Sequence, residues 1–356
     1  MKGRRWKWFF LAWMSFTLIL IFPMSLHAVE NSECLDCHSD PETAPYVNPK
    51  KFEASVHGQQ GIACTDCHSD IEELNYEKEV PHPVPTAPVN CTDCHSDEGA
   101  AYEESVHAKA RAKGVKNAPT CATCHQPHYT PYLASYTVKE KEKLFCSKCH
   151  KPMLYHKWLT QKDTHFAHVD CSLCHAKTKG MINLRPYNPL TMQFIPGKEI
   201  IKALGTSYDS FLKLSDANKN GQLENEELKA IAEKLNKKGL NVTFYGEMVA
   251  ESTPEVHRIS KDAIRNCNAC HSPQSPYLKN VNFILTKSDG EVSRYKVEKA
   301  ALNSFTTSRF YLLNATKVKW VDIIGFILIL GGVCFAGGHL LIRIITIPIR
   351  RKKREG

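Results

Sequence analysis

Fourteen of the fifteen cysteines in this chain occur in pairs that are followed directly by a histidine. The pattern is Cys-x-x-Cys-His, and its copies at 64–70 and 91–97 share the seven residues CTDCHSD. This spacing is typical of c-type haem attachment, because two thiols bind the porphyrin vinyl groups and the adjacent imidazole binds the iron. The sequence therefore predicts seven covalently bound haem c groups. The attaching residues are Cys34, Cys37, Cys64, Cys67, Cys91, Cys94, Cys121, Cys124, Cys146, Cys149, Cys171, Cys174, Cys267 and Cys270, and the proximal iron ligands are His38, His68, His95, His125, His150, His175 and His271.

Other uses of paired cysteines fit this pattern poorly. A zinc site needs four ligands, usually from two Cys-x-x-Cys arms, and does not require a histidine after every arm. A thioredoxin-like motif normally occurs once, and a disulfide framework needs neither the fixed spacing nor the histidine. The fifteenth cysteine, Cys334, lies in an apolar segment near the C-terminus. Haem attachment therefore accounts for every cysteine in the polar part of the chain.

Eight further histidines lie between the apolar end segments and outside the motifs, which is close to the number that seven second axial positions require. An electron-transfer haem of low potential has two strong axial ligands, so the sequence predicts bis-histidine ligation throughout. The segments KFEASVHG (51–58) and AYEESVHA (101–108) repeat a Ser-Val-His context, which favours a ligand role for their histidines over a surface role. One of the close pair His165 and His168 could instead support a ligand or transfer protons. The candidate distal ligands are His57, His82, His107, His128, His156, His165, His168 and His257.

A second motif, DANKNGQLENEE, occupies residues 216–227 and fits the twelve-residue loop of an EF-hand. The candidate calcium ligands are Asp216, Asn218, Asn220, the backbone carbonyl of Gln222 and the closing Glu227. Apolar spacing predicts helices before and after the loop. The affinity should be modest, because only two of these side chains carry charge and no second EF-hand is visible. The alternative is a solvated helix-loop-helix that binds no ion.

Both ends of the chain carry membrane signals. Residues 1–28 combine a basic start, an apolar stretch and a small residue, Ala28, which predicts a secretory signal peptide, although an uncleaved anchor is possible. A second apolar segment, roughly 323–342, is long enough to span a bilayer and is followed by six basic residues. Because such clusters stay cytoplasmic, we expect a single-pass inner-membrane protein whose haem domain lies in the periplasm.

The net charge of +9 comes from these two ends. Residues 29–342 carry 36 basic and 36 acidic side chains, so the body of the chain is neutral before the haem propionates are counted. Basic and aromatic residues are not interleaved as in nucleic-acid binders. The basic character therefore reflects membrane topology and excludes a nucleic-acid partner.

The spacing of the motifs predicts the organisation of the chain. Successive first cysteines are 30, 27, 30, 25, 25 and finally 96 residues apart. About twenty residues per haem cannot form a separate core, so the porphyrins must serve as the core. We expect a mainly α fold with extensive loop, in which stacked haems are wrapped by short helices, and a small β-hairpin within 281–300. The predicted segments are 1–28 (signal peptide), 29–180 (six haems), 181–255 (insertion with the EF-hand-like loop), 256–316 (seventh haem and hairpin), 317–347 (transmembrane helix) and 348–356 (basic tail).

The apolar C-terminal segment carries residues that suggest a partner in the membrane. Gly332 and Ala336 form a small-x-x-x-small pair that lets another helix approach closely. His339 is an ionisable group in a membrane span, where such groups are usually functional. It could share a b-type haem with a partner or accept a proton from quinol. Its alternative role is snorkelling towards the cytoplasmic edge beside Arg343.

Together these residues resemble multihaem c-type cytochromes of bacterial respiratory chains, of the class III and NapC/NirT-like kind. The resemblance rests on the seven motifs and the Ser-Val-His segments, and it covers roughly residues 30–275. NapC-type proteins carry an N-terminal anchor, whereas this chain has its anchor at the C-terminus. The ending GGHLLIRIIT, 337–346, is similar to the start of membrane cytochrome b modules of the thiosulfate-reductase or formate-dehydrogenase type. That similarity implies a separate cytochrome b-type subunit that oxidises menaquinol.

The sequence thus predicts an electron-transfer subunit without catalytic residues of its own. Electrons would pass between the quinone pool, a cytochrome b-type partner and periplasmic donors or acceptors, in either direction. The alternative is a nitrite, hydroxylamine or tetrathionate reductase with one open haem, but every motif ends in histidine and none has the Cys-x-x-Cys-Lys form of nitrite reductases. A second alternative is a module in which calcium regulates docking.

Overall fold

The computed structural model describes residues 29–43, 45–71, 73–82, 88–272, 274–303, 307–308 and 319–347. The predicted signal peptide, 1–28, and basic tail, 348–356, lie outside these residues. The chain divides into two compact units, one comprising Met1–Cys91 with Pro127–Thr130 and the other comprising Thr92–Gln126 with Pro131–Gly356.

The first unit consists of short helices joined by loops. They are α2 (Asn31–His38), α3 (Pro49–Glu53), α4 (Val56–Gln59), α5 (Cys64–Cys67) and the 3₁₀ turn η2 (Pro127–Tyr129). None of these five elements contains a buried residue. Backbone contacts hold them together instead, as when the Val56 N–H donates to the Thr130 carbonyl at 2.8 Å. A unit with so little side-chain core fits the prediction that porphyrins fill its interior.

The second unit contains most of the helices that the structure describes. Those before the first strand are η1 (Cys91–Asp93), whose first residue belongs to the first unit, then α6 (Ser96–Glu103), α7 (Val106–Ala112), α8 (Cys121–Cys124), η3 (Leu133–Ser135), α9 (Val138–Lys141), η4 (Glu142–Cys146), α10 (Pro152–Tyr155), α11 (Lys162–His168) and α12 (Cys171–His175). Those after it are α13 (Gly197–Leu204), α14 (Phe211–Ser215), α15 (Asn225–Asn236), η5 (Pro254–His257), η6 (Cys267–Ala269), η7 (Pro276–Leu278), η8 (Lys299–Asn303) and α16 (Lys319–Ile345).

A six-stranded mixed sheet organises this unit. Its strands are β1 (Gly180–Asn188), β2 (Gln193–Phe194), β3 (Thr243–Ala250), β4 (Val281–Thr286), β5 (Val292–Lys296) and β6 (Thr307–Ser308), in the order β5-β4-β1-β3-β6 with β2 beside β1. β4 and β5 are antiparallel, with Phe283 opposite Tyr295, so the predicted hairpin is confirmed. The hairpin is part of a larger sheet, because β1 pairs in parallel with β4 and antiparallel with β3.

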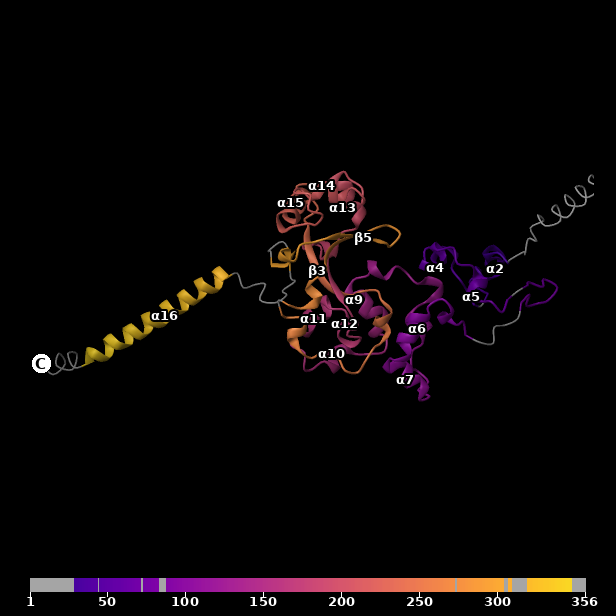
Figure 1. Ribbon diagram of the computed structural model, residues 1–356, viewed down its shortest axis with the longest axis horizontal. Helices are drawn as coiled ribbons and strands as arrows, with labels where there is room; N and C mark the ends of the chain where they lie inside the picture. Colours follow the sequence, from indigo (N-terminus) through magenta and orange to yellow (C-terminus); the bar gives the residue numbers. More distant parts are fainter. Residues whose placement is uncertain are drawn as a thin grey trace, which may run out of the picture. The chain divides into compact units, whose positions relative to one another are not determined.

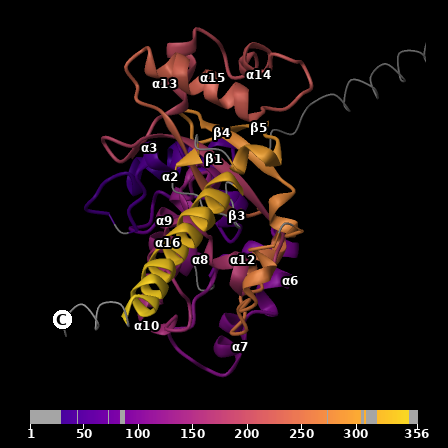
Figure 2. The ribbon, with the colours of Figure 1, turned by 90° about the vertical axis from the view of Figure 1, so that its left-hand side faces the viewer.

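One face of the sheet carries the hydrophobic core of the second unit. Ile182, Leu184, Phe244 and Phe283 are fully buried and belong to one apolar cluster. The cluster continues into α13, α14 and α15 through Ile200, Phe211, Leu228 and Leu235. Figures 1 and 2 show these three helices grouped at one end of the unit, away from α10 and α12. The predicted insertion, 181–255, thus forms the central strands β1 and β3 of the sheet and the three helices that pack on it.

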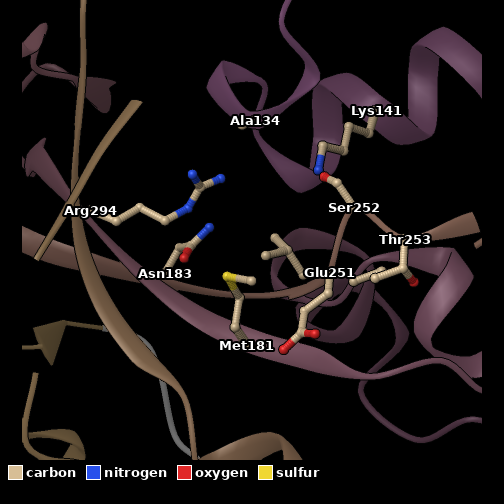
Figure 3. A pocket seen from close by; sticks show the side chains of 10 residues that line it. Ala134, Lys141, Met181, Asn183, Glu251, Ser252, Thr253 and Arg294 are labelled. Carbon is tan, nitrogen blue, oxygen red and sulfur yellow. The ribbon is translucent and has the colours of Figure 1, made fainter. Parts of the chain in front are cut away.

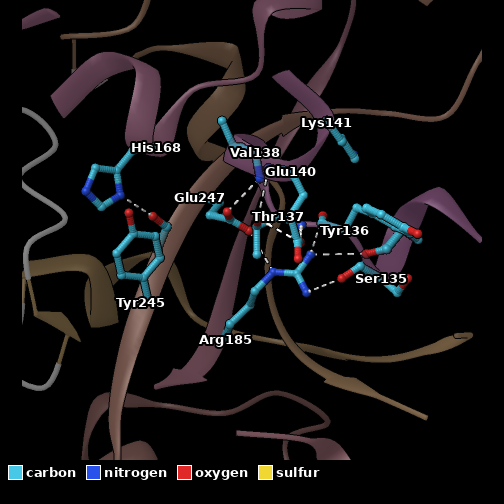
Figure 4. Close-up of polar contacts among 12 residues, drawn as sticks. Ser135, Tyr136, Thr137, Val138, Glu140, Lys141, His168, Arg185, Tyr245 and Glu247 are labelled. Atoms are coloured by element: carbon cyan, nitrogen blue, oxygen red, sulfur yellow. Dashed lines mark hydrogen bonds and ion pairs between the residues drawn. The ribbon is translucent and has the colours of Figure 1, made fainter. Parts of the chain in front are cut away.

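The opposite face of the sheet is polar and packs on the segment that precedes the fifth motif. Arg185 of β1 and Glu247 of β3 form a buried ion pair with 2.6 Å between Nε and Oε2. The guanidinium also donates to the carbonyls of Ala134, Ser135 and Tyr136 at 2.9–3.1 Å (Figure 4). This arrangement fastens the segment that precedes the fifth motif to the sheet.

The last helix, α16, contains 27 residues and would be about 40 Å long. Its segment Ile324–Ile345 is apolar and long enough to cross a bilayer. The expected C-terminal membrane helix is thus present as a helix of suitable length and composition.

Candidate functional site

Each Cys-x-x-Cys-His motif lies on a short helical turn. In four motifs the histidine N–H donates to the carbonyl of the first cysteine, at 2.9 Å for His68–Cys64, 2.8 Å for His125–Cys121, 2.9 Å for His150–Cys146 and 2.7 Å for His271–Cys267. In such a turn, side chains three and four residues apart lie on one side. The fold therefore presents two thiols and one imidazole together, as attachment to one planar group requires.

The cysteines show no sign of the alternative uses. None of the fifteen forms a disulfide bond, so there is no disulfide framework. In the part of the chain that the structure describes, no three His, Cys, Asp or Glu side chains are arranged to hold a bare metal ion. Both observations favour haem attachment over disulfide or zinc chemistry.

Six motif histidines each face a second histidine. The ring centroids are 5.9 Å apart for His38–His82, 6.3 Å for His68–His128, 6.2 Å for His107–His150, 6.1 Å for His125–His257, 5.8 Å for His156–His175 and 6.0 Å for His165–His271. A metal-bound imidazole has its nitrogen about 2 Å from the metal and its ring centre about 1 Å further away, so two axial imidazoles have centroids roughly 6 Å apart. The spacing of all six pairs matches an iron between the rings.

Backbone contacts fix the orientation of several of these rings. The Nδ1 atoms of His38, His156, His165, His175 and His257 each lie 2.8–3.1 Å from a backbone carbonyl oxygen. A carbonyl can only accept, so Nδ1 carries the proton and Nε2 keeps the free lone pair that binds a metal. The rings are thus held in the tautomer that an axial ligand needs.

Burial also favours the neutral, ligating form of three histidines. It lowers the pKa of His107 and of His271, in each case with a further contribution from the facing histidine. The pKa of His128 is lowered by burial and by His68, His38 and His57. A lower pKa keeps the imidazole unprotonated at neutral pH.

The pairs differ in the angle between their ring planes. Four pairs have angles of 31–48°. The angle is 88° for His156–His175 and 70° for His165–His271. Ring orientation sets the energy gap between the two iron d orbitals that interact with the imidazoles. The sixth and seventh sites are therefore expected to differ spectroscopically from the others.

His168 belongs to none of these six histidine pairs. It is buried on the polar face of the sheet, with Nδ1 2.7 Å from the Gly246 carbonyl oxygen. Its ring stacks on Tyr245 at 4.5 Å and 19° (Figure 4). His57 lies in the first unit with its Nδ1 3.0 Å from the Pro127 carbonyl oxygen. His95 lies in the second unit, with Nδ1 3.8 Å from a Glu98 oxygen.

The Ser-Val-His repeat has a structural explanation that sequence reasoning missed. Ser55 and Ser105 are buried N-caps of α4 and α7, and each accepts from a backbone N–H at 3.1 Å. The following valine N–H donates to a carbonyl of another segment, that of Thr130 for Val56 and that of Ile259 for Val106. The cap and the docked N–H place the histidine on the first turn of its helix. The repeated serine was the available signal, since it is the preferred N-cap residue.

Neighbouring motifs lie side by side within each unit. Burial raises the pKa of Cys64 to about 11, and the adjacent Cys34 thiol adds to this rise. In the second unit a hydrogen bond with Cys146, together with burial, raises the pKa of Cys171. Burial also raises the pKa of the Cys124 thiol, with a smaller contribution from Cys146. The pKa of the Cys270 thiol is raised in the same way, by burial and then by Cys174. Motifs one and two are therefore adjacent, as are motifs four and five, five and six, and six and seven.

The EF-hand-like loop has the predicted helices on both sides, α14 and α15. Its two strongest candidate ligands are buried and turned inward: Asp216 Oδ2 accepts from the Gly221 N–H at 2.7 Å, and Glu227 Oε1 accepts from the Ala217 N–H at 2.6 Å. Leu223, the apolar residue of the loop, forms a parallel bridge with Val297 just after β5. That bridge anchors the loop to the sheet.

Comparison with known proteins supports the haem interpretation. Residues 50–151 match the family described as cytochrome c7 and related cytochrome c. No curated protein and no solved structure matches the chain. The match covers the second to fifth motifs, where short helices carry Cys-x-x-Cys-His turns. It supports a multihaem c-type cytochrome with covalently bound haem c, which is a class of electron-transfer proteins.

Proposed function

We propose that this protein is a membrane-anchored seven-haem c-type cytochrome that relays electrons between the quinone pool and periplasmic redox partners. The observation that carries the proposal is the set of six facing histidine pairs, each with the spacing of two axial ligands. Haem c, when bound, supplies the redox-active iron. The chain supplies the attachment thiols, both axial imidazoles and their fixed orientation.

The pairs favour a carrier over a reductase. A reductase needs an open axial position at which its substrate binds, whereas two histidines close the site. With six pairs assigned, His57 and His168 are the candidates left for the one remaining distal position. His168 is the less suited of the two, because its ring is buried and stacks on Tyr245.

The adjacency of the motifs suggests a route for electrons. Motifs four, five, six and seven form a continuous series in the second unit, and motifs one and two adjoin in the first. Attachment sites with neighbouring thiols hold their porphyrins close together. We propose that electrons pass between haems in the order of the sequence within each unit.

The proposed membrane partner is a cytochrome b-type subunit that oxidises quinol. The support is α16, a helix long and apolar enough for a bilayer, with His339 inside its apolar segment. An ionisable residue within a membrane span usually faces a partner or a cofactor. We propose that His339 contacts the haem b or the quinol site of that subunit, with the haem domain in the periplasm.

Electron paramagnetic resonance of the purified, oxidised holoprotein tests the closed-site proposal. All seven haems are expected to be low-spin, and two of them should give strongly anisotropic signals because their imidazole planes are nearly perpendicular. The number of haems per chain is measured in parallel by the pyridine haemochrome assay. A high-spin haem in the fully loaded protein, together with reduction of nitrite, hydroxylamine or tetrathionate, would establish the reductase instead.

We further propose that the loop at 216–227 binds calcium as a structural ion. Its two carboxylates face inward, and the bridge between Leu223 and Val297 fixes the loop to the sheet. Extracellular modules bind calcium with dissociation constants of about 0.1–1 mM. Calcium at 10 mM should therefore stabilise the holoprotein by about 1.5–3 kcal/mol through mass action.

Differential scanning calorimetry with calcium, magnesium or chelator measures this effect. Glu227→Gln should abolish the rise in melting temperature, because Glu227 is the bidentate ligand of the motif. Glu226→Gln is the matched control, since Glu226 is exposed and adjacent but lies outside the ligand positions. Equal responses to calcium in the two variants would show that the loop is a plain helix-loop-helix.

A further inference from the structure

A pocket of about 370 Å³ lies on the polar face of the sheet in the second unit, apart from the histidine pairs. Its walls come from the sheet, from the segment after β3 and from the segment that leads into the fifth motif (Figure 3). Arg294 of β5, Asn183 of β1 and Lys141 of α9 are the nitrogen-bearing side chains of its wall. Met181 and Val249 supply apolar surface.

Arg294 has no acidic partner among the described residues, whereas the other cations of this region do. Arg185 is paired with Glu247 at 2.6 Å, and Lys141 Nζ lies 3.7 Å from Asp170 Oδ2. Burial lowers the pKa of Arg294, and the neighbouring Arg185 lowers it further. An anion bound in the pocket would give the Arg294 guanidinium the counter-charge that it lacks among the described residues.

Asn183 gives a second, independent indication that the pocket binds a ligand. It is only 3% exposed, and its Oδ1 has no hydrogen-bond partner. A buried amide oxygen left without a partner costs about 1–3 kcal/mol. A polar occupant removes this cost, either by donating to Oδ1 or by accepting from Nδ2 after the amide turns over.

We infer that Arg294, Asn183 and Lys141 form a binding pocket for a carboxylate group. A guanidinium binds a carboxylate through two parallel hydrogen bonds, and an ammonium and an amide can complete its shell. The one carboxylate on the pocket wall, Glu251, already accepts from the Asn280 Nδ2 at 3.1 Å. No carboxylate among the described side chains that line the pocket is therefore left for Arg294.

The favoured source of this carboxylate is a haem propionate, which rests on the function proposed above. Lys141 lies five residues before Cys146, and its partner Asp170 directly precedes Cys171. The pocket is thus close to the fifth and sixth haem attachment turns. The other source with the same chemistry is a small free carboxylate such as succinate.

Redox titration and calorimetry of the full-length holoprotein distinguish these sources. Arg294→Gln removes the unpaired cation, Arg294→Lys keeps a charge, and Lys296→Gln removes a charge from an exposed position on the same strand. If a propionate binds, Arg294→Gln should lower the midpoint potential of one haem, because a nearby positive charge favours the reduced iron. Arg294→Lys should restore most of that potential, and Lys296→Gln should leave it unchanged.

If a free carboxylate binds, no potential shifts, but succinate titrated into the wild-type holoprotein should give a calorimetric signal that Arg294→Gln abolishes. Haem content and low-spin spectra are checked first, so that failure of the proposed function is recognised separately. If haem loading is complete, and neither a potential shift nor succinate binding depends on Arg294, the inference is wrong. Should Arg294→Gln not fold, the comparison of Arg294→Lys with wild type decides on the same two readouts.

Discussion

Replacement of Arg185 with methionine is expected to lower the free energy of unfolding of the holoprotein by about 3–5 kcal/mol. The substitution leaves Glu247 buried without its cation, and Glu247 is 1% exposed. It also removes the donors to three carbonyls of residues 134–136. The segment in front of the fifth haem motif would thereby lose its main attachment to the sheet.

The loss should depend on pH. Burial raises the pKa of Glu247, while Arg185 and the Val138 N–H oppose the rise. Without Arg185 this pKa rises further, so the folded state holds a proton that the unfolded state releases at neutral pH. The bound proton therefore stabilises the folded variant below the pKa that Glu247 has in the unfolded chain. This stabilisation is lost as the pH rises through the pKa that Glu247 has in the folded chain. The variant should therefore be closer to wild type at about pH 5 than at about pH 8.

Chemical denaturation followed by far-UV circular dichroism measures both effects. The double variant Arg185→Met with Glu247→Leu is the informative control, because it removes both charges together. It should be more stable than Arg185→Met alone, though less stable than wild type, since the three carbonyls still lack donors. A double variant no better than the single one would mean that the carbonyl contacts, and not the ion pair, fasten this segment.

The local features of this protein were predictable from its sequence, because short-range rules set them. The haem turns need only Cys-x-x-Cys-His, and the hairpin needs two β-prone runs around Ser-Asp-Gly. The strands β1 and β3 were not predicted. β1 contains Arg185 and Pro186, and β3 contains Gly246 and Glu247, all of which are unusual in a central strand. The pairing of the two strands explains the charged residues, because it brings Arg185 and Glu247 together on one face of the sheet.

The pairing of histidines could not be read from spacing for a related reason. Some partners follow their motif in the sequence, as His82 follows His38, whereas others precede it, as His107 precedes His150. A distal ligand is brought in by tertiary contacts such as the hydrogen bond from the Val106 N–H to the Ile259 carbonyl. No rule of local sequence encodes such a contact. The number of distal ligands could be predicted from the sequence, whereas the fold was needed to show which histidine faces which motif.

The close pair His165 and His168 offers the sharpest test of this matching. His165→Ala should convert one of the seven haems from low-spin to high-spin, because His165 faces the motif histidine His271 with the rings 6.0 Å apart. His168→Gln should leave all seven low-spin, because that ring is buried and stacks on Tyr245. The two residues share α11, so a general disturbance of the helix would affect both variants alike.

The readout is the ferric high-spin signal of the oxidised holoproteins, with haem content confirmed for each variant. Added imidazole should return the His165→Ala haem to low-spin by occupying the vacated position, which a merely unfolded site would not allow. A high-spin haem in His168→Gln, with His165→Ala unchanged, would reverse the assignment. The ring at 165 would then be the supporting residue, and the buried histidine on the sheet would be the axial ligand of the seventh haem.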